Sequence, residues 1–350
     1  MLRRRYLVPG ALLLLLVSFG SYQYKQFILA PSGSAGREIR LEELVAERWY
    51  QTATGRELTE SLARVTDSGA MKLASGLYYR EYKRRYSPGV KLTQYVRVGP
   101  NQYPAIHGMI HDACKALGGP DGPVPAPTVY VGWTGKRSFE VTNHESPSLI
   151  IGNDFLWAFK PEELRYLIAR QIGHIQCRHV YLLDVTKGAR ALFDSVLPDN
   201  VSQLLLGGLG GKLLEWQKEA QISADRAGLL VTRDVDTACA ALIKLNILAS
   251  IDDFYGQPDP EEFAAQAAEL GIDRVATASA ALAELKNPNP FLTARVADLL
   301  AFHAANEALF KDRRRSGEPE VPFDPGDYGD EDPGSVAGGP AGVPGVVTGR

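Results

Sequence analysis

The sequence predicts a mostly helical α+β domain with one small β-sheet, and three observations support this fold class. Apolar residues recur at helical spacing over 161–184, which predicts a buried helix. Short β-branched runs precede that helix and predict strands at 128–131, 138–142 and 148–151. Alanine- and leucine-rich segments follow it and predict helices at 236–248, 260–270, 273–285 and 292–310.

Length and composition fit a folded chain with a sizeable core. The chain has 350 residues, of which 45% are apolar and 23% charged, enough for one or two domains. Its net charge of −3 argues against nucleic acid as the main partner. The cysteines are odd in number and match no zinc knuckle or redox pair, so we expect buried small side chains at Cys114, Cys177 and Cys239.

The amino-terminal segment has the pattern of a membrane anchor. A basic cluster at 1–5 precedes an uncharged run at 6–24 that is just long enough to span a bilayer. The cluster predicts that the amino terminus stays in the cytoplasm, with the membrane as a partner of the chain. A cleaved signal peptide at 6–24 is the alternative, although no clear cleavage site follows the run. Both interpretations place the body of the protein outside the cytoplasm.

Composition divides the rest of the chain into three parts. Residues 25–90 are rich in charged, helix-favouring side chains. Residues 91–312 contain the predicted strands and the apolar helices, so we expect the folded domain there. From 313 to 350 the chain is dense in glycine and proline with an acidic middle, which predicts a disordered tail.

The helix predicted at 161–184 has the outline of a metallopeptidase active-site helix with part of its chemistry replaced. In the H-E-x-x-H motif, two histidines on one helical face bind zinc and the glutamate deprotonates the metal-bound water. The same frame here reads RQIGH, from Arg170 and Gln171 to His174. Arginine offers no lone pair to a metal, and a glutamine amide takes no proton from water.

Two downstream motifs give this helix a context. The chain reads EAQISADRAGLL at 219–230 and NPFLTAR at 289–295. In this order the motifs resemble the HtpX and CAAX prenyl protease type of zinc metallopeptidase, family forty-eight of the metallo class. Members of that family carry H-E-x-x-H-x-x-x-x-H, then E-x-x-A-D-x-x-G, then H-P-x-x-x-x-R. The resemblance covers roughly 95–305 and implies a zincin-like domain with a small sheet beside the active-site helix.

The resemblance assigns a family role to five positions that this sequence changes or keeps. The first zinc histidine falls on Arg170, the general-base glutamate on Gln171 and the second zinc histidine on His174. The third zinc ligand falls on Gln221, and the histidine beside the site falls on Asn289. A catalytic zinc needs three protein ligands and an open position for water. The resemblance therefore implies no intact metal site and no intact catalytic residue.

Framework positions of the family are kept. The later histidine of the helix falls on His179, and further framework positions fall on Gly173, Asp225, Gly228 and Arg295. In the family one edge of the small sheet lies along the cleft and can hold an extended peptide. If that edge is kept, the protein can still bind a peptide by strand addition when catalysis is lost.

A physical account of the replaced zinc site follows from Arg170. Its guanidinium would place a fixed positive charge near the position of the zinc charge. The side-chain carbonyls of Gln171 and Gln221, together with Asp225, would accept its hydrogen bonds. On this hypothesis the cavity stays filled by a cation without a metal.

These observations lead us to expect a degenerate, inactive member of the resembling family. It would be a membrane-anchored pseudopeptidase with no cofactor, binding an extended peptide or an envelope protein. One alternative is an active zinc metalloendopeptidase in which His174 joins other ligands, such as His107, His111 or His179, and then zinc is the cofactor. Another is a structural envelope protein whose motif remnants only pack helices.

Overall fold

The computed structural model describes residues 45, 47–66, 88–133, 139–142, 147–186, 199–247, 259–269 and 290–311. All of these fall within one compact unit, Met1–Gly317. The expected membrane segment at 6–24 and the glycine- and proline-rich tail at 313–350 lie outside the described residues. In the ranges given above, no helix has the length and apolar character needed to cross a membrane.

A mixed four-stranded sheet forms one part of this unit, in the order β1 (Val96–Arg97), β2 (Thr128–Gly132), β4 (Ser148–Gly152) and β3 (Phe139–Thr142). β2 and β4 are parallel, whereas β1 pairs antiparallel with β2 and β3 pairs antiparallel with β4. The three predicted strands are thus confirmed to within a residue at each end. β1 was not predicted because it consists of two exposed residues and has no alternation to detect.

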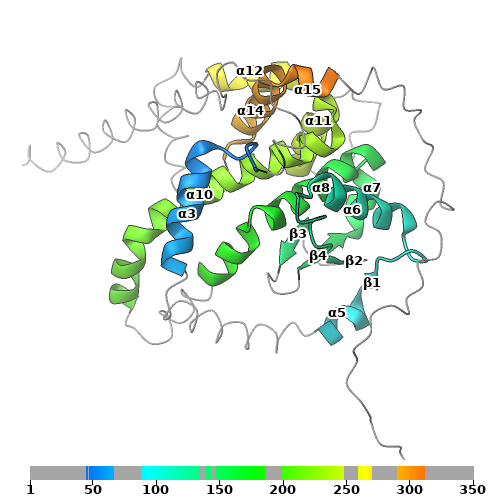
Figure 1. Ribbon diagram of the computed structural model, residues 1–350, viewed down its shortest axis with the longest axis horizontal. Helices are drawn as coiled ribbons and strands as arrows, with labels where there is room; N and C mark the ends of the chain where they lie inside the picture. The colour runs from blue at the N-terminus through cyan, green and yellow to red at the C-terminus, as the bar shows by residue number, and fades with distance from the viewer. Residues whose placement is uncertain are drawn as a thin grey trace, which may run out of the picture. The chain divides into compact units, whose positions relative to one another are not determined.

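Helices make up most of the described chain, and the predicted fold class is confirmed (Figure 1). The expected helix at 292–310 is divided at Asn306, and the one at 273–285 lies outside the described residues. The helices are α3 (Ala53–Thr66), α5 (Pro88–Gln94), α6 (Pro104–Ala116), α7 (Asn153–Ala158), α8 (Pro161–Gln176), α10 (Asp199–Thr232), α11 (Val235–Ile247), α12 (Pro260–Glu269), α14 (Leu292–Ala305) and α15 (Glu307–Lys311).

Helix α8 is the centre of the unit. It packs against α6, α10 and α11, and it lies beside the edge strand β3 (Figure 1). Its residues Leu167, Ile168 and Ile172 are completely buried in the core that also includes the strand residues Leu149 and Ile151. Its first turn carries Pro161 and two glutamates, which suit the positive end of the helix dipole. This arrangement places the middle of α8 against both α10 and the sheet.

Helix α8 ends earlier than its sequence pattern predicts. The expectation of one helix over 161–184 was wrong, because the chain turns at Cys177 and Arg178 before helix resumes at 179–186. Arg178 has a φ of 60°, the left-handed conformation that commonly ends helices, and its N–H donates to the carbonyl of Ile175. The Tyr50 hydroxyl contacts Cys177 Sγ at 3.1 Å and also bonds Gln176. The turn places His179, at the start of the next helical segment, against His174 near the end of α8.

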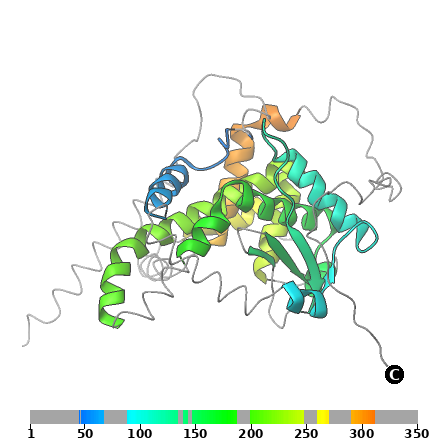
Figure 2. The same cartoon turned by 60° about the horizontal axis from the view of Figure 1, so that its bottom comes forward.

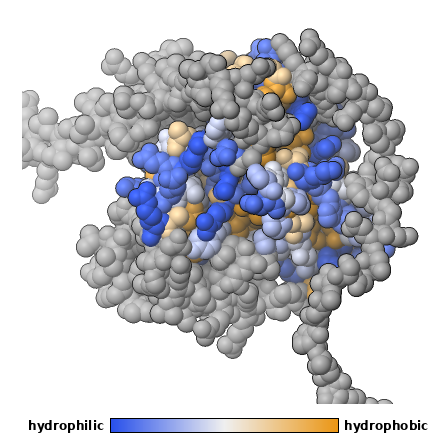
Figure 3. All heavy atoms as spheres, viewed as in Figure 1, coloured by the Kyte–Doolittle hydropathy of each residue, from blue (hydrophilic) through white to orange (hydrophobic). Residues whose placement is uncertain are grey.

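Residues before the predicted domain take part in this packing. In both cartoon views α3 runs beside α10, and the Trp216 Nε1 of α10 donates to Thr59 Oγ1 at 2.9 Å (Figure 2). In the view of Figure 3, hydrophilic residues cover most of the described surface, and apolar residues are visible between them.

The prediction that all three cysteines are buried is confirmed.

Candidate functional site

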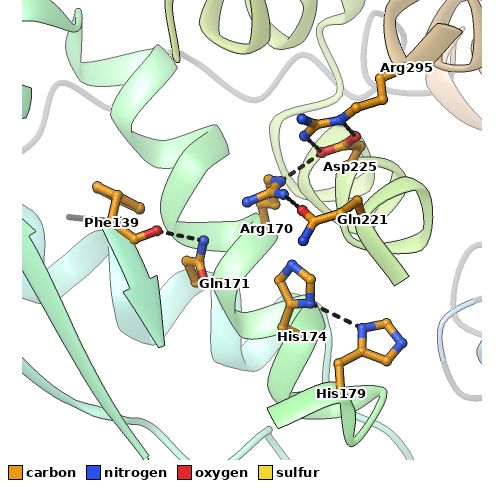
Figure 4. A network of polar contacts seen from close by, with 8 residues as sticks. All are labelled: Phe139, Arg170, Gln171, His174, His179, Gln221, Asp225 and Arg295. Carbon is orange, nitrogen blue, oxygen red and sulfur yellow. Dashed lines mark hydrogen bonds and ion pairs between the residues drawn. The ribbon is translucent and has the colours of Figure 1, made fainter. Parts of the chain in front are cut away.

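The centre of the candidate site is the side chain of Arg170, which α8 directs toward α10 (Figure 4). This arginine is only 6% exposed. Its Nε donates to Asp225 Oδ1 at 2.7 Å, and its Nη2 donates to Gln221 Oε1. Gln221 and Asp225 are four residues apart on α10, so both side chains reach the same guanidinium. The position assigned to the first zinc histidine therefore holds an arginine whose donors are engaged.

Asp225 joins three helices through one carboxylate. Its Oδ2 accepts a hydrogen bond from Arg295 Nε at 2.7 Å, and its Oδ1 accepts another from Arg295 Nη2 at 2.8 Å. The side chain is 1% exposed. Burial alone would raise the pKa of the Asp225 carboxyl, but Arg295 and Arg170 outweigh burial and hold that pKa below its usual value. An ionised carboxylate thus ties α14 to α8 and α10.

These four residues, Arg170, Gln221, Asp225 and Arg295, form what we call the arginine cluster. It contains two guanidinium groups and one carboxylate, so its ionic groups carry one surplus positive charge. A buried surplus charge is unfavourable unless dipoles face it, and the Gln221 carbonyl oxygen faces Arg170. The contacts agree with the expectation that Gln221 and Asp225 accept hydrogen bonds from Arg170.

Gln171 does not take part in the arginine cluster, and the expectation that its carbonyl would accept a hydrogen bond from Arg170 was wrong. Its side chain points to the sheet instead (Figure 4). Gln171 Oε1 accepts a hydrogen bond from the Val141 N–H at 3.2 Å, and its Nε2 donates to the Phe139 carbonyl at 3.0 Å. Consecutive residues of a helix point in different directions, so Arg170 of α8 faces α10 whereas Gln171 faces β3.

His174 and His179 form a buried pair below the arginine cluster. Their Nδ1 atoms lie 3.1 Å apart, so one ring donates a hydrogen bond to the other, and the His179 ring contacts Trp216 edge to face. Burial, with Arg170 next in importance, lowers the pKa of His174 far below its usual value. Burial and Arg170 likewise lower the pKa of His179 to about 3. Both rings are therefore neutral near pH 7, and their facing lone pair and N–H satisfy each other.

Two glycines set the distance between α8 and α10. A Cβ added to Gly173 would lie 2.5 Å from the Ala227 Cβ, and one added to Gly228 would lie 2.6 Å from the Tyr166 ring. Neither position has room for a side chain at the present helix spacing. Close approach of the two helices is what lets Arg170 reach Gln221 and Asp225.

Sequence reasoning missed two buried ion pairs that position the site helices. Glu163 in the first turn of α8 pairs with Lys244 of α11 at 2.8 Å. Arg226 of α10 pairs with Asp298 of α14 at 2.5 Å. Both pairs join residues more than seventy positions apart, as their separations of 81 and 72 show. The preference of acidic residues for a first helical turn was the one local signal, and it indicates a place for Glu163 but not its partner.

Two of the other candidate ligands lie on a different helix from His174. His107 and His111 lie on α6, where their Nε2 atoms are 3.1 Å apart, with His107 half-buried and His111 exposed. Asn289, the position of the family's auxiliary histidine, lies outside the described residues. Over the part of the chain that the structure describes, no three His, Cys, Asp or Glu side chains are grouped so that they could share a metal ion.

The side chains at the family's ligand positions do not fit a zinc ion. Zinc needs lone pairs from nitrogen, sulfur or oxygen at about 2.0–2.3 Å. Arg170 presents only donors and Gln221 turns its one good acceptor to that arginine, so His174, whose Nδ1 faces His179, could offer only one ring nitrogen. A cation at the centre of the arginine cluster would also meet the positive charge of Arg170.

Comparison with known proteins gives a distant relationship. The chain is 25% identical over 238 residues to the plastoglobule-localized metallopeptidase 48 of Arabidopsis thaliana, a chloroplast protein. The chain is a distant relative of a metallopeptidase. The match covers 63% of this chain and 63% of the length of that relative. No model of a protein family and no solved structure matches the chain.

This relationship agrees with the mostly helical architecture and the small mixed sheet beside α8. It says nothing by itself about activity, because a fold can keep its framework while its site changes. Which chemistry this chain performs depends on the side chains at the centre of α8 and α10.

Proposed function

We propose that this protein is a pseudopeptidase, a metallopeptidase scaffold that has lost its zinc site and serves as a peptide-binding module. One observation carries the proposal. Arg170 stands at a family ligand position and donates hydrogen bonds to Asp225 and Gln221, the latter a second family ligand position. The charge that zinc brings to its relatives is supplied here by a side chain that never deprotonates in proteins.

The base position supports the same proposal. A glutamate there would accept a proton from water, whereas Gln171 has no basic oxygen and is turned to the backbone of β3. Both requirements of metal-assisted peptide hydrolysis, a bound metal and a base, are therefore lacking at the family positions. We further propose that the uncharged run at 6–24 anchors the protein in a membrane, with the body on the outer side and an extended peptide or envelope protein as its partner.

The restored variant Arg170→His, Gln171→Glu, Gln221→Glu tests the proposal. We expect the full wild-type chain to give no zinc binding in calorimetric titration and no casein hydrolysis. We expect the triple variant to bind one zinc ion per chain, and a further His174→Ala change to abolish that binding. The Asp225 and Arg295 pair stays intact in every variant, so the three helices remain joined.

Two results would contradict the proposal. Tight, stoichiometric zinc binding by the wild-type chain, together with casein hydrolysis lost in His174→Ala, would establish an active enzyme with other ligands. Absence of zinc binding by a folded triple variant would show that the family's ligand positions were carried over to the wrong residues of α8 and α10.

A further inference from the structure

The outer edge of β3 carries the next inference, which rests on the proposed function because it names the peptide site of that module. Within the described strands β3 is outermost, with β4 on one side. Glu140 lies opposite Ile150 and Thr142 opposite Ser148 in the antiparallel register. Backbone groups of alternate residues in a strand face opposite sides. The Phe139 carbonyl and the Val141 N–H face away from β4, because both bond the side chain of Gln171 instead.

The side chain of Gln171 forms hydrogen bonds with both of those backbone groups. Its carbonyl accepts from Val141 and its N–H donates to Phe139, at 3.2 Å and 3.0 Å, and the residue is 3% exposed. One residue of a parallel neighbouring strand makes the same pair of bonds, accepting from one residue and donating to the residue two positions earlier. The carboxamide therefore has the chemistry and the spacing of a peptide unit docked on the edge (Figure 4).

The residue type matters for this contact. An ionised glutamate at the same position can accept from Val141 but cannot donate to Phe139, because a carboxylate has no N–H. Replacing glutamate by glutamine at this position adds the N–H donor and at the same time removes the basic carboxylate. A change that removes catalysis thus also closes the sheet edge from within.

We infer that the Gln171 carboxamide is an internal substitute for an extended peptide and holds the outer edge of β3, the peptide site of the proposed function, closed. The ligand is a main-chain segment that offers an N–H to Phe139 and a C=O to Val141. Recognition through the backbone tolerates many side chains, but it excludes proline at the residue that donates to Phe139, since proline has no N–H. The peptide docks when the Gln171 side chain rotates away and its hydrogen bonds with Phe139 and Val141 break.

The test uses the full chain and a short capped peptide of alternating threonine and valine, with a matched peptide N-methylated at its central amide. Gln171→Ala removes both internal bonds, and Gln102→Ala, at an exposed glutamine, is the control. We expect Gln171→Ala to bind the peptide at least about tenfold more tightly than wild type, because two hydrogen bonds no longer compete. The N-methylated peptide and the control variant should show no such gain.

Amide hydrogen exchange at Val141 gives a second readout that does not depend on affinity. The Val141 amide should be protected in wild type, exposed in Gln171→Ala and protected again when the peptide binds. Gln171→Met keeps the side-chain volume without the bonds, so it should expose the Val141 amide while leaving peptide binding weak.

Equal Val141 exchange in wild type and Gln171→Met, or no gain in affinity for folded Gln171→Ala, would overturn the inference. Neither result depends on zinc content. An active zinc enzyme would refute the proposed function and leave the exchange result standing, so the two failures are distinguishable.

Discussion

The start and the centre of α8 both hold buried ions, and they differ in how the charges balance. At the start, Glu163 meets Lys244 in a pair of one anion and one cation. At the centre, Arg170 and Arg295 share the single carboxylate of Asp225. A balanced pair serves to join two helices. At the centre the surplus cation is faced by a neutral amide, the arrangement that the proposed replacement of a metal by Arg170 predicts.

Removing the shared carboxylate should have the largest effect. Asp225→Ala leaves two buried guanidinium groups without their anion, so we expect a loss in unfolding free energy at or above the about 3–5 kcal/mol typical of a broken buried pair. Urea unfolding of the variant and of wild type measures this loss in unfolding free energy. Asp112→Ala, at an exposed ion pair with Arg165 at 3.7 Å, is the control and should change stability by less than about 1 kcal/mol. Equal effects of the two changes would remove the basis for the arginine cluster.

The two arginines of the cluster should not be equivalent. Arg295→Met removes the two-bond partner of Asp225 and should destabilise by about 3–5 kcal/mol. Arg170→Met removes the surplus charge and leaves the Asp225 and Arg295 pair complete, so we expect a change within about 1 kcal/mol of wild type. Matched urea titrations of the two variants measure the difference. A larger loss for Arg170→Met would contradict the charge balance described above.

Acid should destabilise the protein through the histidine pair. Unfolded histidines bind protons below about pH 6.5, whereas the buried rings resist protonation, His179 down to a pKa of about 3. The unfolded state then binds more protons, so unfolding free energy falls with falling pH by about 1.4 kcal/mol per unit for each ring. Arg170 and Arg48 face His179 and act in the same direction. His179→Phe keeps a ring against Trp216 and should reduce the slope by about half, and an unchanged slope would contradict the assignment.

The smallest expected effect tests the helix spacing that the cluster needs. Gly173→Ala places a methyl group against Ala227 and should destabilise by about 1–2 kcal/mol. The same change at Gly99, where a Cβ meets nothing within 4 Å, should stay within about 0.5 kcal/mol. A double-mutant cycle of Gly173→Ala with Arg170→Met should show coupling, whereas one with Lys244→Met should show none.

Much of the fold followed from local sequence patterns. Strand alternation and helical spacing predicted β2, β3, β4, α11 and α12 to within two residues. The break after Gln176 was not visible, because the helical pattern continues through a turn that depends on a left-handed Arg178. β1 was missed because its two residues are paired only through β2.

The candidate site, like the fold, was predicted from the sequence only in part. Family spacing brought Arg170, Gln221 and Asp225 together before the structure did, since helix periodicity fixes which residues share a face. The direction of Gln171 was wrong because it depends on the position of β3 relative to α8, which no local pattern encodes. Lys244 was missed for a similar reason, since its partner lies 81 positions away.

The most direct test of the central claim is the metal content of the full wild-type chain, purified without chelator and measured by elemental mass spectrometry. The account predicts zinc far below one atom per chain and no difference between wild type and His174→Ala. Near-stoichiometric zinc that disappears in His174→Ala would contradict it, because a metal would then bind where Arg170 is proposed to stand in for one.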